Sequence, residues 1–324
     1  MKRRDLNYIL NLVVALFHRL MLARALTVGP YSRPCVLVTG STDGIGTTTV
    51  KHVAAKGYNV LIHGRNEQRI ENTAKEVRSF VQQHSRHQDM EIFSLPAQDI
   101  STVNGCKALV ENVKTICQEK ELSLVVLMNN AGVYSEDRII TEDGIELTFA
   151  VNVMAVFVIT SLLLPELLKQ KSRIVVASSI SQCGSIRDWD DLNFSTRPYS
   201  AHGAYSESKL FDAMLTMEFA SRLENAGFGT DQITSNCLDP GTVNTKMLLA
   251  GWGRIGIDVE NALDETWLCT SDEVESTTGY YFTGRIPRKA SSPAYNQSER
   301  DKLWTMLSDL APEAAEMWKF DFLN

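Results

Sequence analysis

The chain has 324 residues, of which 44% are hydrophobic and 22% are charged. These values are typical of a folded globular protein and exclude a chain that is disordered over most of its length. The formal net charge of −7 argues against nucleic acid as a partner, because a nucleic-acid-binding protein needs a basic face.

The six cysteines are scattered along the chain, and none of them forms a CxxC pair. Zinc sites usually need such closely spaced pairs, and disulfide frameworks belong mostly to short secreted chains. His84 and His87 are close in sequence, but no third ligand lies near them. We therefore expect buried thiols in a reducing compartment and no metal site.

Residues 1–30 differ from the rest of the chain, because they carry five basic side chains and one acidic one. Apolar residues recur there at helical spacing, which predicts an amphipathic helix. Its unbroken apolar stretch of about ten residues is shorter than the roughly 20 that a simple transmembrane helix needs. Three interpretations stay open: peripheral membrane contact, a mitochondrial or other targeting peptide, and a helix packed on the protein's own surface. The expected location is accordingly cytoplasmic, membrane-associated or mitochondrial.

From Cys35 onward, short apolar runs alternate with amphipathic stretches. This alternation predicts an α/β fold: a Rossmann-type, doubly wound parallel sheet in a single domain over residues 31–324. A short helical extension is expected at about 286–324, with its helix at 298–310 and Ser298 as N-cap. The expected strands are 35–39, 59–63, 91–95, 124–128, 173–177, 232–238 and 280–282. Another expected helix ends at Gly57. The remaining expected helices cover 66–84, 103–117, 146–168 and 204–223.

A glycine-rich turn follows the first expected strand and has the spacing TGxxxGxG. Glycines let the backbone turn tightly and approach a pyrophosphate, which then sits against the amide groups at the start of the next helix. The turn therefore predicts a dinucleotide site. Its cofactor-binding residues would be Thr39, Gly40, Ser41, Asp43, Gly44, Ile45 and Gly46.

Tyr205 and Lys209 are four residues apart on an expected helix and so share one face. An unperturbed tyrosine has a pKa of about 10, too high for an efficient base near neutral pH. A nearby ammonium group stabilises the phenolate and lowers that pKa. None of the other eight tyrosines has a lysine at this spacing. The pair predicts general acid–base chemistry on a carbonyl or alcohol oxygen.

Four segments follow one another along the chain: the glycine turn, an NNAG segment at Asn129–Gly132, the Tyr205–Lys209 pair and a PGxxxT segment at Pro240–Thr245. In this order they resemble the short-chain dehydrogenase/reductase family. The resemblance covers roughly Val36 to Phe282 and implies an oxidoreductase that transfers a hydride between nicotinamide and a small-molecule carbonyl or alcohol substrate. It implies a catalytic set of Asn152, Ser179, Tyr205 and Lys209, with Ser178 as the alternative serine. It adds as cofactor contacts Asp99, Ile100, Asn130, Ala131, Gly132, Tyr205, Lys209, Pro240, Gly241, Val243 and Thr245. A homodimer is expected by analogy with the family.

The second expected strand leads into His63-Gly64-Arg65-Asn66. Relatives that select NAD(H) place an acid here for the ribose 2′-hydroxyl, and none is present. Arg65 offers a permanently charged fork that can pair with a 2′-phosphate. These residues favour NADP(H) over NAD(H).

The segment at residues 188–193 and the tail at 303–307 resemble the retinol-dehydrogenase-like branch of the family. This likeness implies a lipophilic substrate, such as an aldehyde, ketone, sterol or retinoid. The substrate loop is expected at about 242–263, with pocket residues Met247, Leu248, Leu249 and Trp252.

Three other classes of protein fit the sequence less well. A catalytically idle scaffold or redox sensor with the same fold would bind the cofactor without turnover, but no member of the catalytic set is missing. A nucleotide-sugar epimerase or dehydratase usually shows TGxxGxxG and a larger C-terminal domain, neither of which is found. A serine hydrolase of the GxSxG type is disfavoured because that motif is absent from the sequence.

Overall fold

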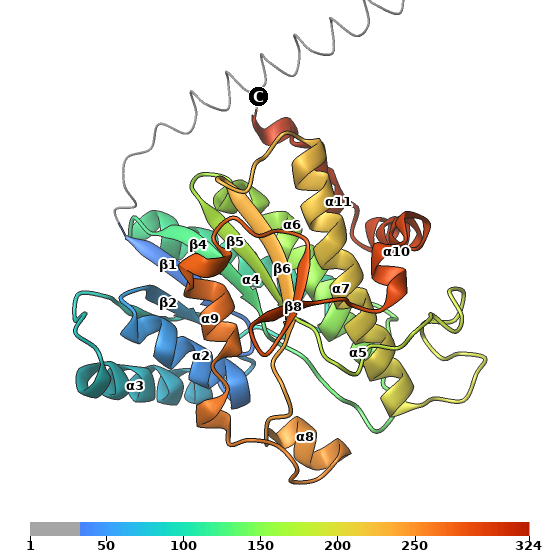
Figure 1. The fold of residues 1–324 in the computed structure, drawn as a ribbon, viewed down its shortest axis with the longest axis horizontal. Helices are drawn as coiled ribbons and strands as arrows, with labels where there is room; N and C mark the ends of the chain where they lie inside the picture. The colour runs from blue at the N-terminus through green and yellow to red at the C-terminus, as the bar shows by residue number, and fades with distance from the viewer. Residues whose placement is uncertain (1–32, 324) are drawn as a thin grey trace, which may run out of the picture.

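Eight strands form one sheet in the computed structural model, which describes residues 33–323 (Figure 1). The strand order is β3-β2-β1-β4-β5-β6-β7-β8, and all neighbours are parallel except β7 and β8. The strands are β1 (Pro34–Val38), β2 (Asn59–Ile62), β3 (Ile92–Ser94), β4 (Ser123–Asn129), β5 (Ser172–Ala177), β6 (Ile233–Asp239), β7 (Tyr280–Thr283) and β8 (Ile286–Arg288).

The order of the first six strands confirms the expected doubly wound α/β fold. The chain builds outward from β1 to β3 and then returns to the other side of β1 with β4, so the direction reverses between β1 and β4. In open α/β sheets, ligands bind outside the carboxyl ends of the strands at this reversal. The helix expected within residues 1–30 lies outside the described residues.

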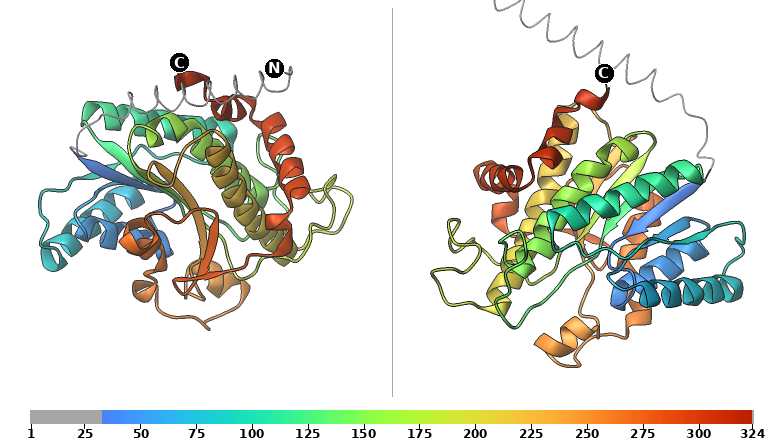
Figure 2. Two further views of the ribbon diagram at one scale, coloured as in Figure 1. Left: turned by 45° about the horizontal axis from the view of Figure 1, so that its top comes forward. Right: turned by 180° about the vertical axis from the view of Figure 1, so that it is seen from behind.

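Helices cover both faces of the sheet (Figures 1 and 2). One face carries α2 (Gly44–Ala55), α3 (Glu67–His84) and α9 (Asp264–Thr270), and the other carries α4 (Val103–Glu119), α6 (Ala155–Leu167) and α7 (Ala201–Asn225). The alternation along β1 explains both cores: Cys35 and Leu37 face α4 and α6, whereas Val36 and Val38 face α2 and α3. The view from behind in Figure 2 shows α4 and α6 lying across the sheet.

The stretch expected as one helix over 146–168 is helical but changes its winding. It consists of α5 (Leu147–Phe149), a π-helical turn (Ala150–Met154) and α6. Residues Leu147–Leu167 are long and apolar enough to cross a membrane, yet 89% of their most apolar window is buried inside the protein. The apolar character of this segment is therefore that of a core helix.

The C-terminal extension is helical, as expected, and begins with a strand that was not expected. β8 is only three residues long, is exposed and contains a proline, so it carries no alternating pattern. Gly284 and Arg285 both have positive φ angles, 57° and 64°, and form the two-residue turn of a β7–β8 hairpin. Two helices follow, α10 (Gln297–Leu310) and α11 (Pro312–Glu316).

The expected N-cap of α10 is wrong by two residues. The cap is Asn296, whose Oδ1 accepts hydrogen bonds from the backbone N–H groups of Ser298 and Glu299. Both residue types can cap a helix, and the sequence alone does not say which one keeps an extended backbone. The tail is part of the core, since Trp318 donates to Ser161 at 2.8 Å and stacks on Phe219.

Candidate active site

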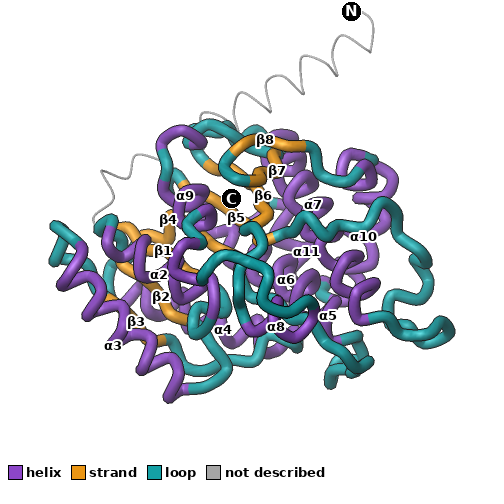
Figure 3. Tube along the Cα trace, turned by 60° about the horizontal axis from the view of Figure 1, so that its bottom comes forward, coloured by secondary structure: helices purple, strands orange, loops and turns teal. Residues whose placement is uncertain are grey.

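A cleft of about 900 Å³ lies at the carboxyl ends of the strands. Figure 3 looks toward this end of the sheet, where the loops after the strands gather around α8 (Lys246–Gly251). Most of the site residues expected from the sequence line the cleft. These are Gly40, Asp43, Gly44, Ile45, Arg65, Asp99, Ile100, Asn130, Ala131, Gly132, Ser179, Tyr205, Lys209, Pro240, Gly241, Val243 and Thr245.

The glycine-rich turn begins directly after β1 and needs glycine for two reasons. Gly40 has a φ angle of 65°, and a Cβ there would lie 2.9 Å from the Cα of Ala131.

The Gly40 N–H donates to Nδ1 of the buried His63 at 3.1 Å. His63 therefore carries its proton on Nε2, which donates to the carbonyl of Gln98 at 3.1 Å. Burial lowers the pKa of His63 to about 4, so the ring is neutral at pH 7.

Four expected residues lie behind the cleft rather than in its lining: Thr39, Ser41, Gly46 and Asn152. The Thr39 hydroxyl accepts hydrogen bonds from the backbone N–H groups of Asn130 and Ala131 at 3.1 and 3.0 Å. Ser41 exchanges hydrogen bonds with the backbone of His63. A Cβ at Gly46 would lie 2.5 Å from Nδ2 of the Asn130 side chain. Thr39, Ser41 and Gly46 therefore hold the turn against the ends of β2 and β4.

The start of α2 points at the cleft. Asp43 is its N-cap and accepts from the Gly44 N–H at 2.8 Å. Its carboxylate also pairs with Arg69 at 2.7 Å and with Lys246 at 2.6 Å, which ties α3 and α8 to the turn. The amino end of a helix favours negative charge, so this is where phosphates would bind.

Arg65 and Asp99 form the far end of the cleft. Arg65 is exposed, and within residues 33–323 it has no acidic partner, whereas Arg69 is paired with Asp43. The carboxylate of Asp99 accepts from the Ser101 N–H at 3.0 Å. Both residues thus line the cleft, and the Arg65 guanidinium group has no ion-pair partner among the described residues.

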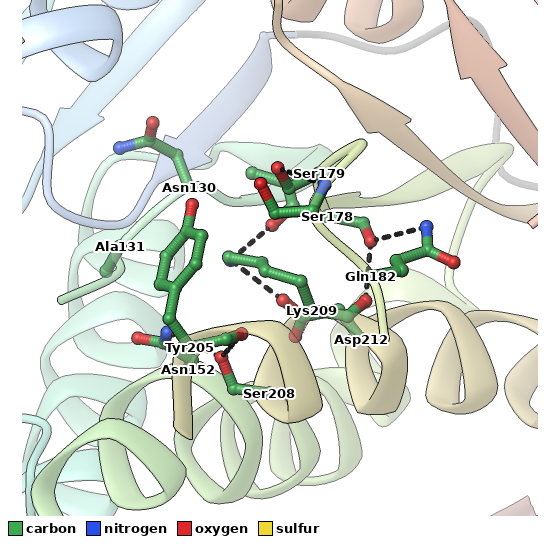
Figure 4. Close-up of polar contacts among 12 residues, drawn as sticks. Asn130, Ala131, Asn152, Ser178, Ser179, Gln182, Tyr205, Ser208, Lys209 and Asp212 are labelled. Carbon is green, nitrogen blue, oxygen red and sulfur yellow. Dashed lines mark hydrogen bonds and ion pairs between the residues drawn. The ribbon is translucent and has the colours of Figure 1, made fainter. Parts of the chain in front are cut away.

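Ser179, Tyr205 and Lys209 meet at the opposite end of the cleft (Figure 4). The Nζ atom of Lys209 lies 5.6 Å from the centre of the Tyr205 ring. Burial raises the pKa of Tyr205 above its ordinary value; Lys209 and a hydrogen bond with Ser179 act in the opposite direction. The two α7 side chains therefore share one face, as their spacing predicted.

The two serines at the end of β5 have different environments. The Ser178 hydroxyl is hydrogen-bonded to other protein groups: its Oγ donates to the Lys209 carbonyl at 2.6 Å and accepts from Gln182 at 3.1 Å. Ser179 faces Tyr205, and its Oγ accepts from the Ser181 N–H at 3.0 Å. Of the two, Ser179 is the one whose hydroxyl can meet a bound substrate beside Tyr205.

Asn152 lies in the π-helical turn and is fully buried. Its side-chain amide bridges the backbone of Val133, at 2.8 and 3.1 Å, and donates to Ser208 at 2.9 Å. A Cβ added to Gly132 would lie 3.5 Å from Asn152 Oδ1 and 3.7 Å from Lys209 Nζ. The amide therefore approaches the lysine across a glycine, although no direct hydrogen bond joins them.

The mouth of the cleft is apolar on the side of the expected substrate loop. Met247, Leu248 and Trp252 line it as expected, but Leu249 does not and is 47% exposed. The centres of the Trp252 and Tyr205 rings lie 5.9 Å apart, so the loop approaches Tyr205 directly.

Several lining residues were not expected from the sequence. They are Thr42, His63, Gly64, Asn66, Arg69, Val133, Val151, Ala177, Ile180, Ser181, Ile255 and Glu265, among others. Ile180 and Ile255 are 72% and 68% exposed. Residues of these types occur throughout the chain, and only the fold brings these ones to one cleft.

The residues present fit a nicotinamide dinucleotide. The cleft offers the start of a helix for the pyrophosphate, an Arg and an Asp at one end, and a Tyr–Lys pair at the other. Gly241, with a φ angle of 83°, presents its backbone to open space between them.

Comparison with known proteins agrees with this geometry. The model of the short chain dehydrogenase family matches residues 34–251. Human polyprenol dehydrogenase is 31% identical over 286 residues, covering 83% of this chain and 82% of that one. Human retinol dehydrogenase 14 is 34% identical over 295 residues, covering 83% of each chain.

Solved structures show the same fold. A protein from Mycobacterium paratuberculosis is 24% identical, with a TM-score of 0.67, and covers 86% of this chain and 93% of that one. A short chain dehydrogenase from Shigella flexneri, complexed with NADP, is 22% identical with a TM-score of 0.58 and covers 79% and 98%. The chain therefore belongs to the short-chain dehydrogenase/reductase family, and it is an NAD(P)-dependent oxidoreductase that acts on CH–OH and C=O groups.

Proposed function

We propose that the protein interconverts lipophilic carbonyl compounds and alcohols with NADP(H), using Tyr205 as the general acid and base. The observation that carries this proposal is the convergence of Ser179, Tyr205 and Lys209 at one end of the cleft. A phenol, a hydroxyl and an ammonium group around one space are what a reacting carbonyl oxygen requires.

In the direction of reduction, Tyr205 donates its phenolic proton to the carbonyl oxygen. Ser179 donates a hydrogen bond to the same oxygen and holds it beside the phenol. Lys209 stabilises the phenolate that remains, because its ammonium group lies 5.6 Å from the ring. The nicotinamide, when bound, supplies the hydride for reduction and accepts it in oxidation. For oxidation the roles reverse, and the Tyr205 phenolate takes the proton of the alcohol.

The preference for NADP(H) rests on Arg65. An arginine without an acidic partner among the described residues can pair with a 2′-phosphate through two parallel hydrogen bonds. The 2′-hydroxyl of NAD(H) offers no such charge. Asp99 and Ile100 would hold the adenine, and Thr245 with Pro240 and Val243 would orient the carboxamide.

The substrate class follows from the mouth of the cleft. Met247, Leu248 and Trp252, in the loop proposed to bind substrate over residues 242–263, present apolar surface next to Tyr205. The names of the similar proteins, retinol and polyprenol dehydrogenases, refer to lipophilic alcohols. A substrate of this kind would reach the mouth most directly from a bilayer, in line with the membrane contact considered for residues 1–30.

A substrate screen on the purified full chain tests the proposal. Long-chain and isoprenoid aldehydes and their alcohols are each offered with NADPH, NADH and the oxidised cofactors, and turnover is followed by absorbance of the reduced nicotinamide. Tyr205→Phe is the matched control, with cofactor binding measured in parallel. We expect turnover of apolar substrates with NADPH, and cofactor binding without turnover in the variant. Cofactor binding without any turnover by the wild type would favour the idle scaffold instead.

A further inference from the structure

The ammonium group of Lys209 is held by a partner that the proposed reaction does not use. Its Nζ donates to the Ala177 carbonyl at 2.7 Å and to Oδ2 of Asp212 at 2.8 Å (Figure 4). Asp212 lies one turn further along α7, and the two side chains are 6% and 1% exposed. Two of the three ammonium N–H groups are therefore committed away from the cleft.

Asp212 is an unusual residue for this place. Its second oxygen, Oδ1, is buried and has no hydrogen-bond partner among residues 33–323. A buried carboxylate with one bare oxygen destabilises a fold unless a nearby cation compensates it. Burial raises the pKa of Asp212 to about 7, and the Lys209 charge acts in the opposite direction. The fold thus keeps a poorly solvated acid whose main partner is the proposed catalytic lysine.

Other titratable groups surround this pair on three elements. They are Tyr205 on α7, Cys237 and Asp239 on β6, and Glu265 on α9. Burial raises the pKa of Cys237 to about 12, so it stays a neutral thiol. Burial also raises the pKa of Glu265 to about 7, and its Oε2 accepts from Thr49. Asp212, rather than any of these four groups, accepts a hydrogen bond from the Lys209 ammonium.

An anion beside the ammonium group changes what Lys209 does to Tyr205. A lone cation near the ring favours the phenolate, but an ion pair acts as a dipole and its effect falls off with distance much faster. Burial is the largest cause of the raised pKa of Tyr205. The charge of Asp212 raises this pKa further. The protonated phenol is what carbonyl reduction consumes, whereas alcohol oxidation needs the phenolate.

We propose that Asp212 is a positioning residue that holds Lys209 against Ala177 and weakens its action on Tyr205, so that the phenol stays protonated near neutral pH and the site is set for carbonyl reduction. This inference rests on the proposed function, because it assumes that Tyr205 exchanges a proton with the substrate. Asp212 thereby sets the pH range in which each direction runs.

The test compares pH profiles of kcat in both directions, from about pH 6 to about pH 10. Oxidation rises with pH as the phenolate forms, and reduction falls over the same range. In Asp212→Asn, which keeps the shape and removes the charge, both midpoints should move to lower pH by about one unit, which makes oxidation about tenfold faster on the rising limb. Asp212→Leu should move them in the same direction.

Glu218→Gln is the matched control. Glu218 is a buried carboxylate on the same helix, but Arg222 and Arg300 pair with it on the far side from the cleft. Its removal should leave both midpoints in place. A merely structural role for Asp212 would lower kcat at every pH without moving the midpoints, and that result would overturn the inference.

The outcomes separate this inference from the proposed function. No turnover by the wild type, or full turnover by Tyr205→Phe, would refute the proposed function itself. Turnover that needs Tyr205, with unmoved midpoints in the Asp212 variants, would refute only the inference. If neither variant folds, the wild-type profile decides: a midpoint at or below neutral pH contradicts a phenol that is kept protonated there.

Discussion

His63 allows a sharp prediction, because it joins the glycine-rich turn to the next loop. Its Nδ1 accepts from the Gly40 N–H, and its Nε2 donates to the Gln98 carbonyl. Protonation of Nδ1 would place two hydrogen atoms against each other at the Gly40 contact. Replacing His63 with Asn retains an acceptor near the Nδ1 position, removes the titrating ring and loses the bond to Gln98.

The magnitude follows from the pKa. Burial lowers the pKa of His63 from 6.5 to about 4. The unfolded chain therefore binds the proton more tightly, and the stability from a neutral His63 is complete above pH 6.5 and is lost as the pH falls to 4. At 1.36 kcal/mol per pH unit, this loss is about 3 kcal/mol. The missing Gln98 bond should lower the stability of His63→Asn by about 1 kcal/mol at every pH.

Urea unfolding, followed by tryptophan fluorescence at about pH 7 and about pH 4.5, measures this difference. Asp212 and Glu265 titrate in the same range with the opposite sign: burial raises their pKa values, so their contribution is lost as the pH rises. Both proteins contain these carboxyl groups, so their effect cancels in the comparison. We expect the wild type to lose about 2–3 kcal/mol more than His63→Asn. Equal losses would refute the assignment of a buried neutral imidazole.

Three further predictions concern the ends of the cleft. Arg65→Ala should raise the KM for NADPH by about 10- to 100-fold, because a charge-assisted hydrogen bond contributes about 1.5–3 kcal/mol. The KM for NADH should stay nearly unchanged. An equal effect on both KM values would contradict the role of Arg65. Ser179→Ala should lower kcat by about 10²-fold with cofactor binding intact. Ser178→Ala should instead lower the free energy of unfolding by about 1 kcal/mol, since its hydroxyl holds the Lys209 carbonyl. The opposite pattern in the two serine variants would exchange their roles.

Much of the fold could be predicted because the signals are local. Continuous apolar runs mark strands that are buried on both faces, and the long periodic segments mark the helices. β8 was missed because three exposed residues with a proline carry no period. The cap of α10 was misplaced because Ser298 and Asn296 are both good capping residues, and tertiary packing decides between them.

The site was predictable where function depends on spacing. Tyr205 and Lys209 are one turn apart, so a helix places them together without further knowledge. Asp212 is three residues after Lys209, so the same helical spacing predicts that the two side chains are neighbours. The sequence does not predict that Asp212 is buried. Glu265 gives no local signal at all, because it reaches the cleft through the packing of α9 on the sheet.

In the proposed reaction, the Tyr205 phenol exchanges the proton in the chemical step. The most direct measurement is a single-turnover reduction of an apolar aldehyde by NADPH, with Tyr205→Phe beside the wild type and the cofactor affinity determined for both. We expect equal NADPH affinity and a reduction rate at least about 10²-fold lower in the variant. A variant that binds NADPH and reduces the aldehyde at the wild-type rate would contradict it.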